Sequence, residues 1–281
     1  MIFHHPGILG YDFGPSHPLR PERMVRTLRL LAHWGIVPTH PGEGSRDDLL
    51  RVHDREYVDV VFRAGHGEAS PDEIRARSLY GDTPVFPEMG ERSLDYVSGV
   101  ARAAREVRDG ASVAICLDGG LHHAHRDRAS GFCVFSDPSI AVSILRERFS
   151  RVAYVDIDVH HGDGPQGIFW SDPSVLTVSI HESGRTLFPG TGDVTETGVG
   201  LSALNLPMPA GVGERGWLDA LLAVVPDRIR AFGAEAIVLQ MGTDTHHTDP
   251  LAHVNSTQDA WLASVVAVRD LGLPIVAVGG G

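Results

Sequence analysis

Five short apolar runs recur along the chain, and they constrain its fold more than any other feature. They are rich in Val and Ile, show no polar alternation, and cover residues 112–117, 151–157, 174–180, 234–241 and 273–279. Runs of this kind are typical of parallel strands buried on both faces. Segments of helical length lie between them, at 21–33, 89–108, 137–149, 215–232 and 256–270. This alternation predicts an α/β fold with a central, mostly parallel sheet.

Local signals predict where two of the helices start and where the long loops lie. Asp137 followed by Pro138 predicts an N-cap for the helix at 137–149, and Ser256 or Asn255 could cap the helix at 256–270. Three connecting segments are long and rich in Gly, Pro, His and Asp, namely 65–90, 118–136 and 181–215. Long loops in a compact domain more often carry function than not.

Composition narrows the class of protein. The chain has 281 residues and a net charge of −12, which argues against nucleic acid and anionic membranes as partners and is compatible with a cationic substrate. Its two cysteines, Cys116 and Cys133, suit a reducing cytoplasm. The start "MIFHHPG" has no features of a signal peptide, and no apolar run reaches the ~20 residues of a membrane span. We therefore expect a cytoplasmic protein.

Histidines and acids gather where four of the predicted strands end. The segments "DGGLHHAH", "DVHHGDG", "HESG" and "GTDTHHTDP" each follow one apolar run. In α/β sheets, ligands bind outside the carboxyl ends of the strands. Taken singly, such residues are more often loop caps or solvated turns. Their repetition on four strands favours a shared site.

The spacing of Asp158 and His160 predicts a metal site. Side chains at i and i+2 of an extended segment point to the same face, so this pair offers two ligands of an open zinc site. Asp244, at a matching strand end, is the candidate third ligand. Zn²⁺ suits two carboxylates and one imidazole, and Fe²⁺ or Co²⁺ would also fit.

The adjacent histidines His122 and His123 are candidates for proton transfer. Neighbouring histidines are often a surface coincidence, but these stand at another strand end rich in polar residues. Imidazole can take a proton from water and give one to a leaving group near neutral pH. Asp156 and Asp163 are available to fix the imidazole tautomers. A nucleophilic role for Cys133 is disfavoured, because "GFCVF" has the pattern of a buried segment.

Several motifs together resemble a known family. "GGLHHAH", "GFCVFSD", "YVDIDVHHGDG", "TVSIHESG", "FPGTGDV" and "LQMGTDT" occur in the order found in the zinc-dependent histone deacetylase superfamily. The segments "YDFGPSHPLRPERM" and "YGDTPVFPEMGE" look most like its bacterial acetoin-utilisation branch. The resemblance runs from about residue 4 to residue 281. It implies one catalytic domain over 1–281 with a three-layer arginase/deacetylase-like fold.

The resemblance also implies an activity and a set of site residues. The activity is removal of acetyl groups from acetyl-lysine in proteins, releasing lysine and acetate. The zinc ligands would be Asp158, His160 and Asp244, with His123 as general base and acid, His122 as its electrostatic partner, and Asp156 and Asp163 paired with His122 and His123. A structural potassium ion would bind Asp156, Asp158, His160, Ser179 and Ile180. The acyl-lysine channel would be formed by Gly131, Phe132, Phe188 and Leu251, with Asp82 gripping the substrate backbone and Arg23 lining the acetate exit.

The resemblance leaves three alternatives and one expectation about the end of the chain. In the family, a Tyr that polarises the acetyl carbonyl follows the terminal glycines, so we expect that the sequence is truncated at Gly281. An acetylpolyamine amidohydrolase would use the same chemistry on a small cationic substrate. A non-catalytic acetyl-lysine-binding protein is a second alternative. An arginase-type enzyme, which needs two manganese ions, is a third. The oligomeric state stays open.

Overall fold

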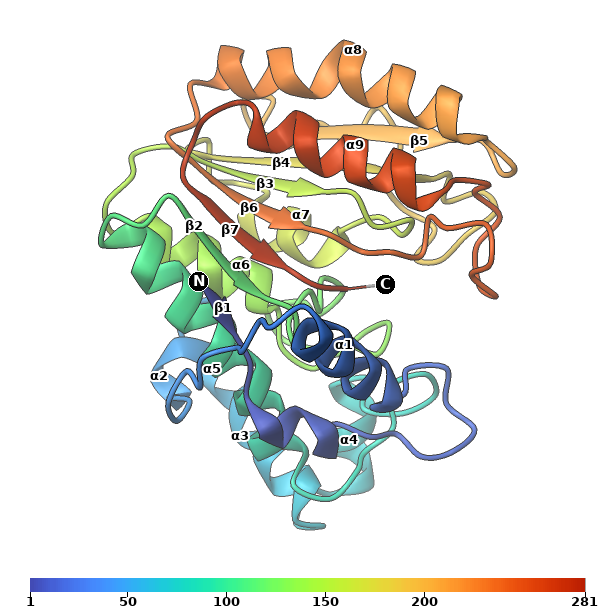
Figure 1. The fold of residues 1–281 in the computed structure, drawn as a ribbon. Helices are drawn as coiled ribbons and strands as arrows, with labels where there is room; N and C mark the ends of the chain where they lie inside the picture. The colour runs from blue at the N-terminus through green and yellow to red at the C-terminus, as the bar shows by residue number, and fades with distance from the viewer. Residues whose placement is uncertain (281) are drawn as a thin grey trace.

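A seven-stranded parallel sheet forms the centre of the computed structural model, which describes residues 1–280 (Figure 1). The strands lie in the order β1-β2-β7-β6-β3-β4-β5, and every neighbouring pair is parallel. Their bounds are β1 (Ile2–Phe3), β2 (Val113–Cys116), β3 (Val152–Asp156), β4 (Val175–Glu182), β5 (Ala203–Met208), β6 (Ala236–Gln240) and β7 (Ile275–Val278). The predicted α/β class is confirmed, and all five predicted strands are present.

The sequence reasoning missed the two edge strands. β1 has only two residues, which is too short for a periodic signal. β5 lies inside 181–215, which we expected to be a loop, and its burial alternates instead of being continuous. Pro207 in β5 pairs with β4 at the edge of the sheet, where a missing N–H donor is tolerated. Edge strands face water on one side, so they lack the uniform apolar pattern of the interior strands.

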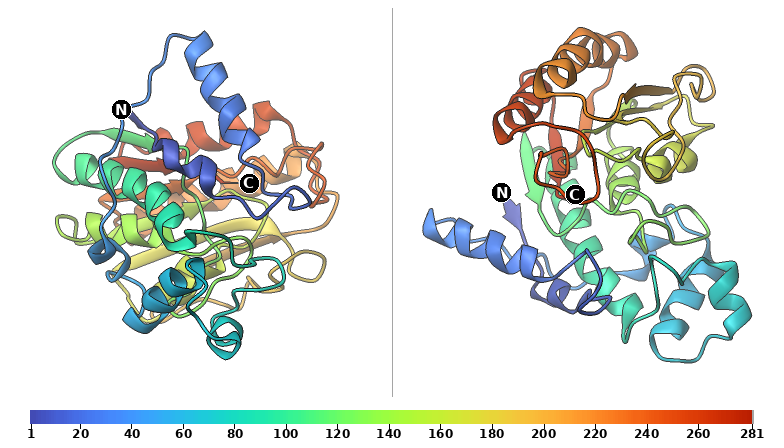
Figure 2. Two further views of the ribbon diagram at one scale, coloured as in Figure 1. Left: turned by 90° about the horizontal axis from the view of Figure 1, so that it is seen from below. Right: turned by 90° about the vertical axis from the view of Figure 1, so that its right-hand side faces the viewer.

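Helices cover both faces of the sheet and form the outer layers (Figure 2). α8 and α9 lie on one face, and α5 and α6 lie on the other with the shorter helices beyond them. The bounds are η1 (Pro6–Gly10), α1 (Glu22–His33), α2 (Arg46–Leu49), α3 (Arg55–Gly65), α4 (Pro71–Ala76), α5 (Met89–Arg108), α6 (Asp137–Leu145), α7 (Asp163–Phe169), α8 (Glu214–Phe232) and α9 (Gln258–Arg269). The sequence did not predict α2, α3, α4 and α7. Within residues 1–280, no helix is both long and apolar enough to cross a membrane.

Asp137 is not the N-cap that its sequence context predicted. It is the first residue of α6, and Ser136 occupies the cap position. The fully buried Asp137 carboxylate instead accepts hydrogen bonds from the backbone N–H groups of Gly120 (2.8 Å) and Leu121 (2.9 Å). It therefore fastens the loop that leads into His122.

The predicted cap of α9 was also displaced along the chain. Neither Ser256 nor Asn255 caps this helix. Thr257 has an extended backbone, and its hydroxyl accepts a hydrogen bond from Ala260 N–H at 3.4 Å. Ser256 is buried and pairs with His246 in an isolated parallel bridge, so its backbone is committed to that contact.

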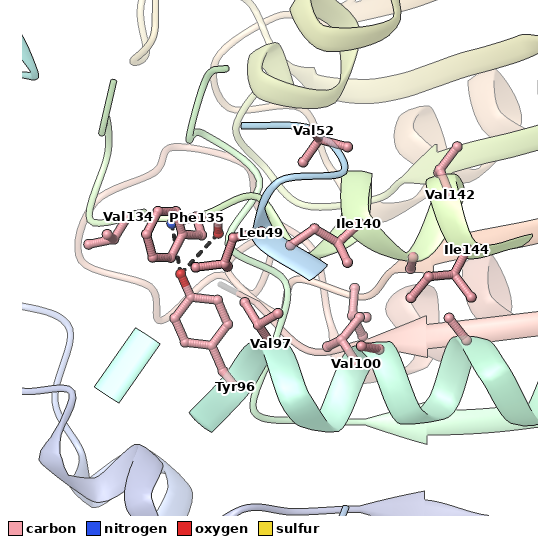
Figure 3. Packing of buried hydrophobic residues seen from close by; sticks show 14 of the residues in the cluster. Leu49, Val52, Tyr96, Val97, Val100, Val134, Phe135, Ile140, Val142 and Ile144 are labelled. Atoms are coloured by element: carbon pink, nitrogen blue, oxygen red, sulfur yellow. Dashed lines mark hydrogen bonds between the residues drawn. The ribbon is translucent and has the colours of Figure 1, made fainter. Parts of the chain in front are cut away.

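Two hydrophobic cores lie on opposite faces of the sheet. In the core beneath α5 and α6, the Tyr96 ring packs among Val97, Val134 and Phe135 (Figure 3). Its hydroxyl donates to Phe135 O at 3.0 Å and accepts from Phe135 N–H at 2.8 Å. Apolar cover on both faces explains why the interior strands show no polar alternation.

His53 is a buried polar residue that connects the α2–α3 region to α6. Its Nε2 atom accepts from Ser136 N–H at 2.9 Å, and its Nδ1–H donates to Arg126 O at 3.3 Å. Burial lowers the pKa of His53 to about 4 from an ordinary value of 6.5. The neutral imidazole is therefore part of the native packing.

We predict that His53 makes folding stability fall as the pH drops. Below pH 6.5 the unfolded chain binds a proton that folded His53 takes up only near pH 4. At about 1.4 kcal/mol per pKa unit, the free energy of unfolding should lose up to about 3 kcal/mol across this window. In urea titrations at pH 7 and pH 4, His53→Gln should lose less stability than the wild type. The exposed-site control His33→Gln should lose as much unfolding free energy as the wild type between pH 7 and pH 4. An equally large loss in His53→Gln would contradict the prediction.

Candidate active site

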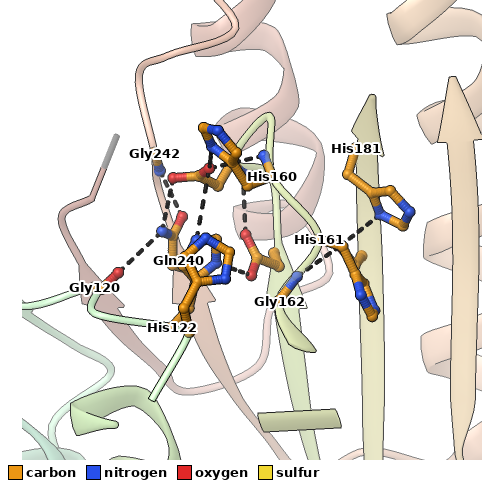
Figure 4. A network of polar contacts seen from close by, with 12 residues as sticks. Gly120, His122, His160, His161, Gly162, His181, Gln240 and Gly242 are labelled. Atoms are coloured by element: carbon orange, nitrogen blue, oxygen red, sulfur yellow. Dashed lines mark hydrogen bonds and ion pairs between the residues drawn. The ribbon is translucent and has the colours of Figure 1, made fainter. Parts of the chain in front are cut away.

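The carboxyl ends of β2, β3, β4 and β6 lie at one edge of the sheet, and the predicted polar residues gather there (Figure 4). β3 and β6 are paired neighbours that end in register, with Asp156 opposite Gln240. Asp158 and His160 follow the end of β3 by two and four residues, and Asp244 follows the end of β6 by four. Parallel pairing therefore brings the two segments together, although they are more than 80 positions apart in sequence.

Asp158, His160 and Asp244 form the predicted three-residue cluster. Each offers one ligand atom, and these atoms lie within 4.8 Å of one another. The Nδ1 atom of His160 is 3.1 Å from Asp158 Oδ1 and 3.0 Å from Asp244 Oδ2. Both carboxylates are buried, and His160 is largely buried. One imidazole nitrogen thus faces two carboxylate oxygens but can donate only one hydrogen.

The electrostatics of this cluster favour a bound cation. Burial and the negative charge of Asp158 raise the pKa of Asp244 to about 7. Burial opposes the charged form of His160, but hydrogen bonds to Asp158 and Asp244 outweigh it and raise the pKa of His160 to about 10. A proton retained here offsets the negative charge of the two carboxylates, and a bound metal ion would offset it in the same way. Two carboxylate oxygens and one imidazole nitrogen suit Zn²⁺ or Fe²⁺, so these residues fit such a metal.

Gln240 supports the cluster, and the sequence reasoning did not assign it a role. This fully buried residue donates from Nε2 to Asp158 Oδ2 at 3.0 Å and to Gly120 O at 3.2 Å. Val159 N–H similarly donates to Asp244 Oδ1 at 2.8 Å. Contacts of this kind orient metal-binding side chains. The signal was present, since Gln240 is the one polar residue in the strand "AIVLQ".

Each member of the histidine pair binds its own carboxylate. His122 Nδ1 is 2.7 Å from Asp156 Oδ2, and His123 Nδ1 is 2.7 Å from Asp163 Oδ1. The two rings lie 4.0 Å apart, centroid to centroid, at an angle of 49°. The pairing that the resemblance implied is therefore present in the geometry.

The two histidines nevertheless hold protons very differently. Burial opposes the charged form of His122, but Asp156 and Asp158 outweigh it and raise the pKa of His122 to about 9. Burial and the positive charge of His122 lower the pKa of His123 to about 4, although Asp163 opposes this. A charged and a neutral imidazole therefore lie side by side, a separation typical of sites that divide electrostatic and proton-transfer roles.

Two further side chains complete these pairs and were not singled out from the sequence. His125 Nε2 lies 3.2 Å from Asp163 Oδ2, so this carboxylate contacts two histidines. The buried Tyr154 hydroxyl donates to Asp156 Oδ2. His125 is the last residue of the "HHAH" segment, and Tyr154 precedes Asp156 by two on the same strand, so both lay within motifs already recognised.

Aromatic and glycine residues lie beside His123. The Phe188 ring is 4.9 Å from the His123 ring, nearly perpendicular to it. A Cβ atom at Gly131 would come within 2.5 Å of His123 and 2.8 Å of Phe188, so the space there excludes any side chain. Phe132 is partly buried and has a φ of 68°. Gly131, Phe188 and His123 are therefore packed closely together.

Other residues implied by the resemblance lie farther out. Asp82 is exposed in the loop between α4 and α5. Leu251 is exposed in the loop after Asp244, where its N–H donates to Asp249 Oδ1. The Arg23 guanidinium, at the start of α1, donates to Gly280 O at 3.0 Å. The position after Gly281, where the resemblance predicts Tyr, lies outside the described residues.

Of the residues predicted to hold potassium, Asp156 ends β3, Ser179 and Ile180 lie on β4, and Asp158 and His160 belong to the three-residue cluster itself. Asp156 pairs directly with Ser179 in the parallel register, and Ile180 follows in β4. The Ser179 hydroxyl oxygen accepts from Gly162 N–H at 3.4 Å and lies 2.8 Å from Nδ1 of His181. Burial lowers the pKa of His181 to about 3, which keeps this neighbour neutral.

Known proteins are similar to this chain over most of its length. Residues 17–281 match the family described as "Histone deacetylase domain". The chain is 36% identical over its full length to the acetoin utilization protein AcuC of Bacillus subtilis (strain 168), covering 76% of that protein. Over 99% of its length it is 33% identical to the histone deacetylase clr6 of Schizosaccharomyces pombe, covering 71% of that protein.

A solved structure is similar to this chain in its fold. An acetylpolyamine aminohydrolase from Burkholderia pseudomallei superimposes with a TM-score of 0.88 at 28% sequence identity. The likeness covers all of this chain and 93% of that one. The arginase/deacetylase-like fold implied by the motifs is thus confirmed. With a family match over most of its length and relatives above 30% identity, the chain belongs to the histone deacetylase family.

Proposed function

We propose that this protein is a zinc-dependent amidohydrolase that removes acetyl groups from acetyl-lysine in proteins, releasing lysine and acetate. The observation that carries the proposal is the convergence of Asp158, His160 and Asp244 beside a histidine pair of unlike charge. Membership of the histone deacetylase family supports it, as does the similarity to an acetoin utilization protein.

The metal would be held by Asp158, His160 and Asp244. When bound, Zn²⁺ supplies Lewis-acid polarisation of a carbonyl and lowers the pKa of water, and Fe²⁺ would suit the same ligands. His160 must release its Nδ1 proton to bind a metal, so loading is coupled to proton release. A structural K⁺ would be held by Asp156, Asp158, His160, Ser179 and Ile180.

His123 would move the protons of the reaction. Its Nδ1–H donates to Asp163, which leaves Nε2 as the unprotonated nitrogen of a neutral imidazole. Nε2 can therefore accept the proton of the attacking water and return it to the departing lysine amine. His122, kept positive by Asp156, would stabilise negative charge that develops on the acetyl oxygen in this buried site. Atoms balance as amide plus water giving amine plus acetate.

The residues around His123 would bind the substrate. Phe132 and Phe188 would offer aromatic faces to the apolar acyl-lysine stem. Gly131, which has no Cβ, lets the Phe188 and His123 rings pack close to the backbone beside that stem. Leu251 would extend this surface at the rim. Asp82 would accept hydrogen bonds from backbone N–H groups of a peptide. The cationic Arg23 would line the path by which acetate leaves.

Metal content tests the centre directly. We expect about one zinc or iron per purified chain, measured by plasma mass spectrometry, and less than about a tenth of that in Asp158→Ala, because the variant loses one of three ligands. Asp270→Ala, which removes an exposed carboxylate at the end of α9, should retain the metal. A folded wild-type chain that binds no metal even after zinc is added would refute the centre.

Removal of the proposed base tests the mechanism. His123→Ala should lower kcat/KM for an acetyl-lysine peptide by about 10²–10⁴ while the metal content stays at the wild-type level, since general acid–base catalysis contributes about this factor. Acetate release is the measurement, and the exposed-site variant His33→Ala is the control. Hydrolysis that survives His123→Ala unchanged would show that another group transfers the proton.

The likeness to an acetylpolyamine aminohydrolase favours one alternative substrate class, a small acetylated amine, and the net charge of −12 is compatible with it. We expect kcat/KM for an acetyl-lysine peptide to exceed that for acetylputrescine by about tenfold or more, a difference of about 1.4 kcal/mol in transition-state binding. Parallel assays of both substrates measure this ratio. A preference for acetylputrescine would replace the protein-deacetylase proposal by the polyamine one.

A further inference from the structure

Three segments that are distant in sequence meet around Phe132, next to Gly131, through a small set of polar contacts. We call this region the rim of the site. The segments are the loop before α1 with His17, the loop between α4 and α5 with Asp82 and Thr83, and the loop carrying Phe132. Asp82 is exposed, but the next residue, Thr83, is fully buried. A buried hydroxyl directly beside an exposed acid is an arrangement that calls for a physical reason.

The Thr83 hydroxyl forms two hydrogen bonds that use both of its capacities. It donates to Asp82 Oδ1 at 3.0 Å and accepts from Phe132 N–H at 3.0 Å. The carbonyl of Phe132 accepts from the Tyr11 hydroxyl at 2.6 Å. Side chains therefore hold both backbone polar groups of Phe132, whose φ of 68° is uncommon for a residue with a side chain.

His17 provides a second connection between the same two positions. Its Nδ1 atom accepts from Leu19 N–H at 3.1 Å, which leaves Nε2–H to donate to Asp82 O at 3.0 Å. The His17 ring also meets the Phe132 ring edge-on, with centroids 4.5 Å apart at 77°. His17, Asp82, Thr83 and Phe132 thus form a closed ring of contacts, which we term the rim clamp.

From this geometry we propose that Thr83 is a positioning residue that makes the site selective for acyl-lysine within a polypeptide. The inference rests on the proposed function and specifies its substrate class. Thr83 fixes Asp82 relative to the wall formed by Phe132, so the carboxylate is preorganised. Because Thr83 bonds to Oδ1, Oδ2 is the oxygen that would accept a peptide N–H. A small acetylated amine has no backbone amide to place there.

Equilibrium binding to the zinc-loaded protein tests the clamp. The probes are a fluorescent acetyl-lysine peptide, followed by anisotropy, and acetylputrescine, followed by calorimetry. Thr83→Val keeps the shape but removes both hydrogen bonds, and should raise Kd about tenfold for the peptide and less than about twofold for acetylputrescine. Thr83→Ser retains the hydroxyl and should restore peptide Kd to within about twofold. Thr83→Ala repeats the deletion if the Val variant does not fold.

A double-mutant cycle separates positioning from a general structural role. Asp82→Ala should weaken peptide binding as Thr83→Val does, and the double variant should be no weaker than either single variant, because Thr83 acts through Asp82. Ser174→Ala is the matched control. It removes a hydroxyl that donates to Asp172. Ser174 immediately precedes β4, at the amino ends of the strands and away from the site, so its loss should leave both Kd values unchanged.

The outcomes distinguish the clamp from the function on which it rests. Equal losses for both probes, additive effects with Asp82→Ala, or no rescue by Ser would overturn the clamp and leave the deacetylase proposal intact. If neither probe binds the zinc-loaded wild type, the deacetylase proposal fails, and the clamp falls with it.

Discussion

Two buried carboxylates face a single imidazole nitrogen at the edge of the sheet, and the rest of the site depends on this crowding. Burying like charges in a medium of low dielectric is unfavourable unless other groups compensate. Here Val159 N–H and the Gln240 amide donate to the two acids. Parallel pairing is what makes the arrangement reachable, because strands that end together bring residues 84 positions apart, His160 and Asp244, to one point.

The same crowding explains why two hydrogen bonds of equal length accompany pKa shifts in opposite directions. His122 and His123 each lie 2.7 Å from a carboxylate, yet the pKa of one is raised and that of the other is lowered. The difference comes from the next neighbours. His122 also faces Asp158, whereas His123 faces the positive charge of His122 itself. The two rings therefore titrate as a pair, and no single hydrogen bond assigns the base.

The sequence predicted best those features that depend on residues close together in the chain. Uniform apolar runs gave the five interior strands, and the spacing of Asp158 and His160 gave the core of the cluster. The edge strands were missed because β1 is too short and β5 alternates. The N-cap prediction for Asp137 was wrong because its carboxylate accepts hydrogen bonds from Gly120 and Leu121 N–H, a contact that no local sequence pattern reveals. The potassium site, the acetate exit and the catalytic roles stay predictions.

Selectivity among acetylated substrates requires a feature beyond the reacting amide. Hydrolysis of an acetamide would place the same demands on the three-residue cluster and the histidine pair, whether the amine belongs to a protein or to a polyamine. Discrimination must then arise where the remainder of the substrate lies, at the rim. A flexible acid there would lose rotational freedom on binding, which weakens the contact. By tying Asp82 to the constrained backbone of Phe132, Thr83 removes that freedom before the substrate arrives.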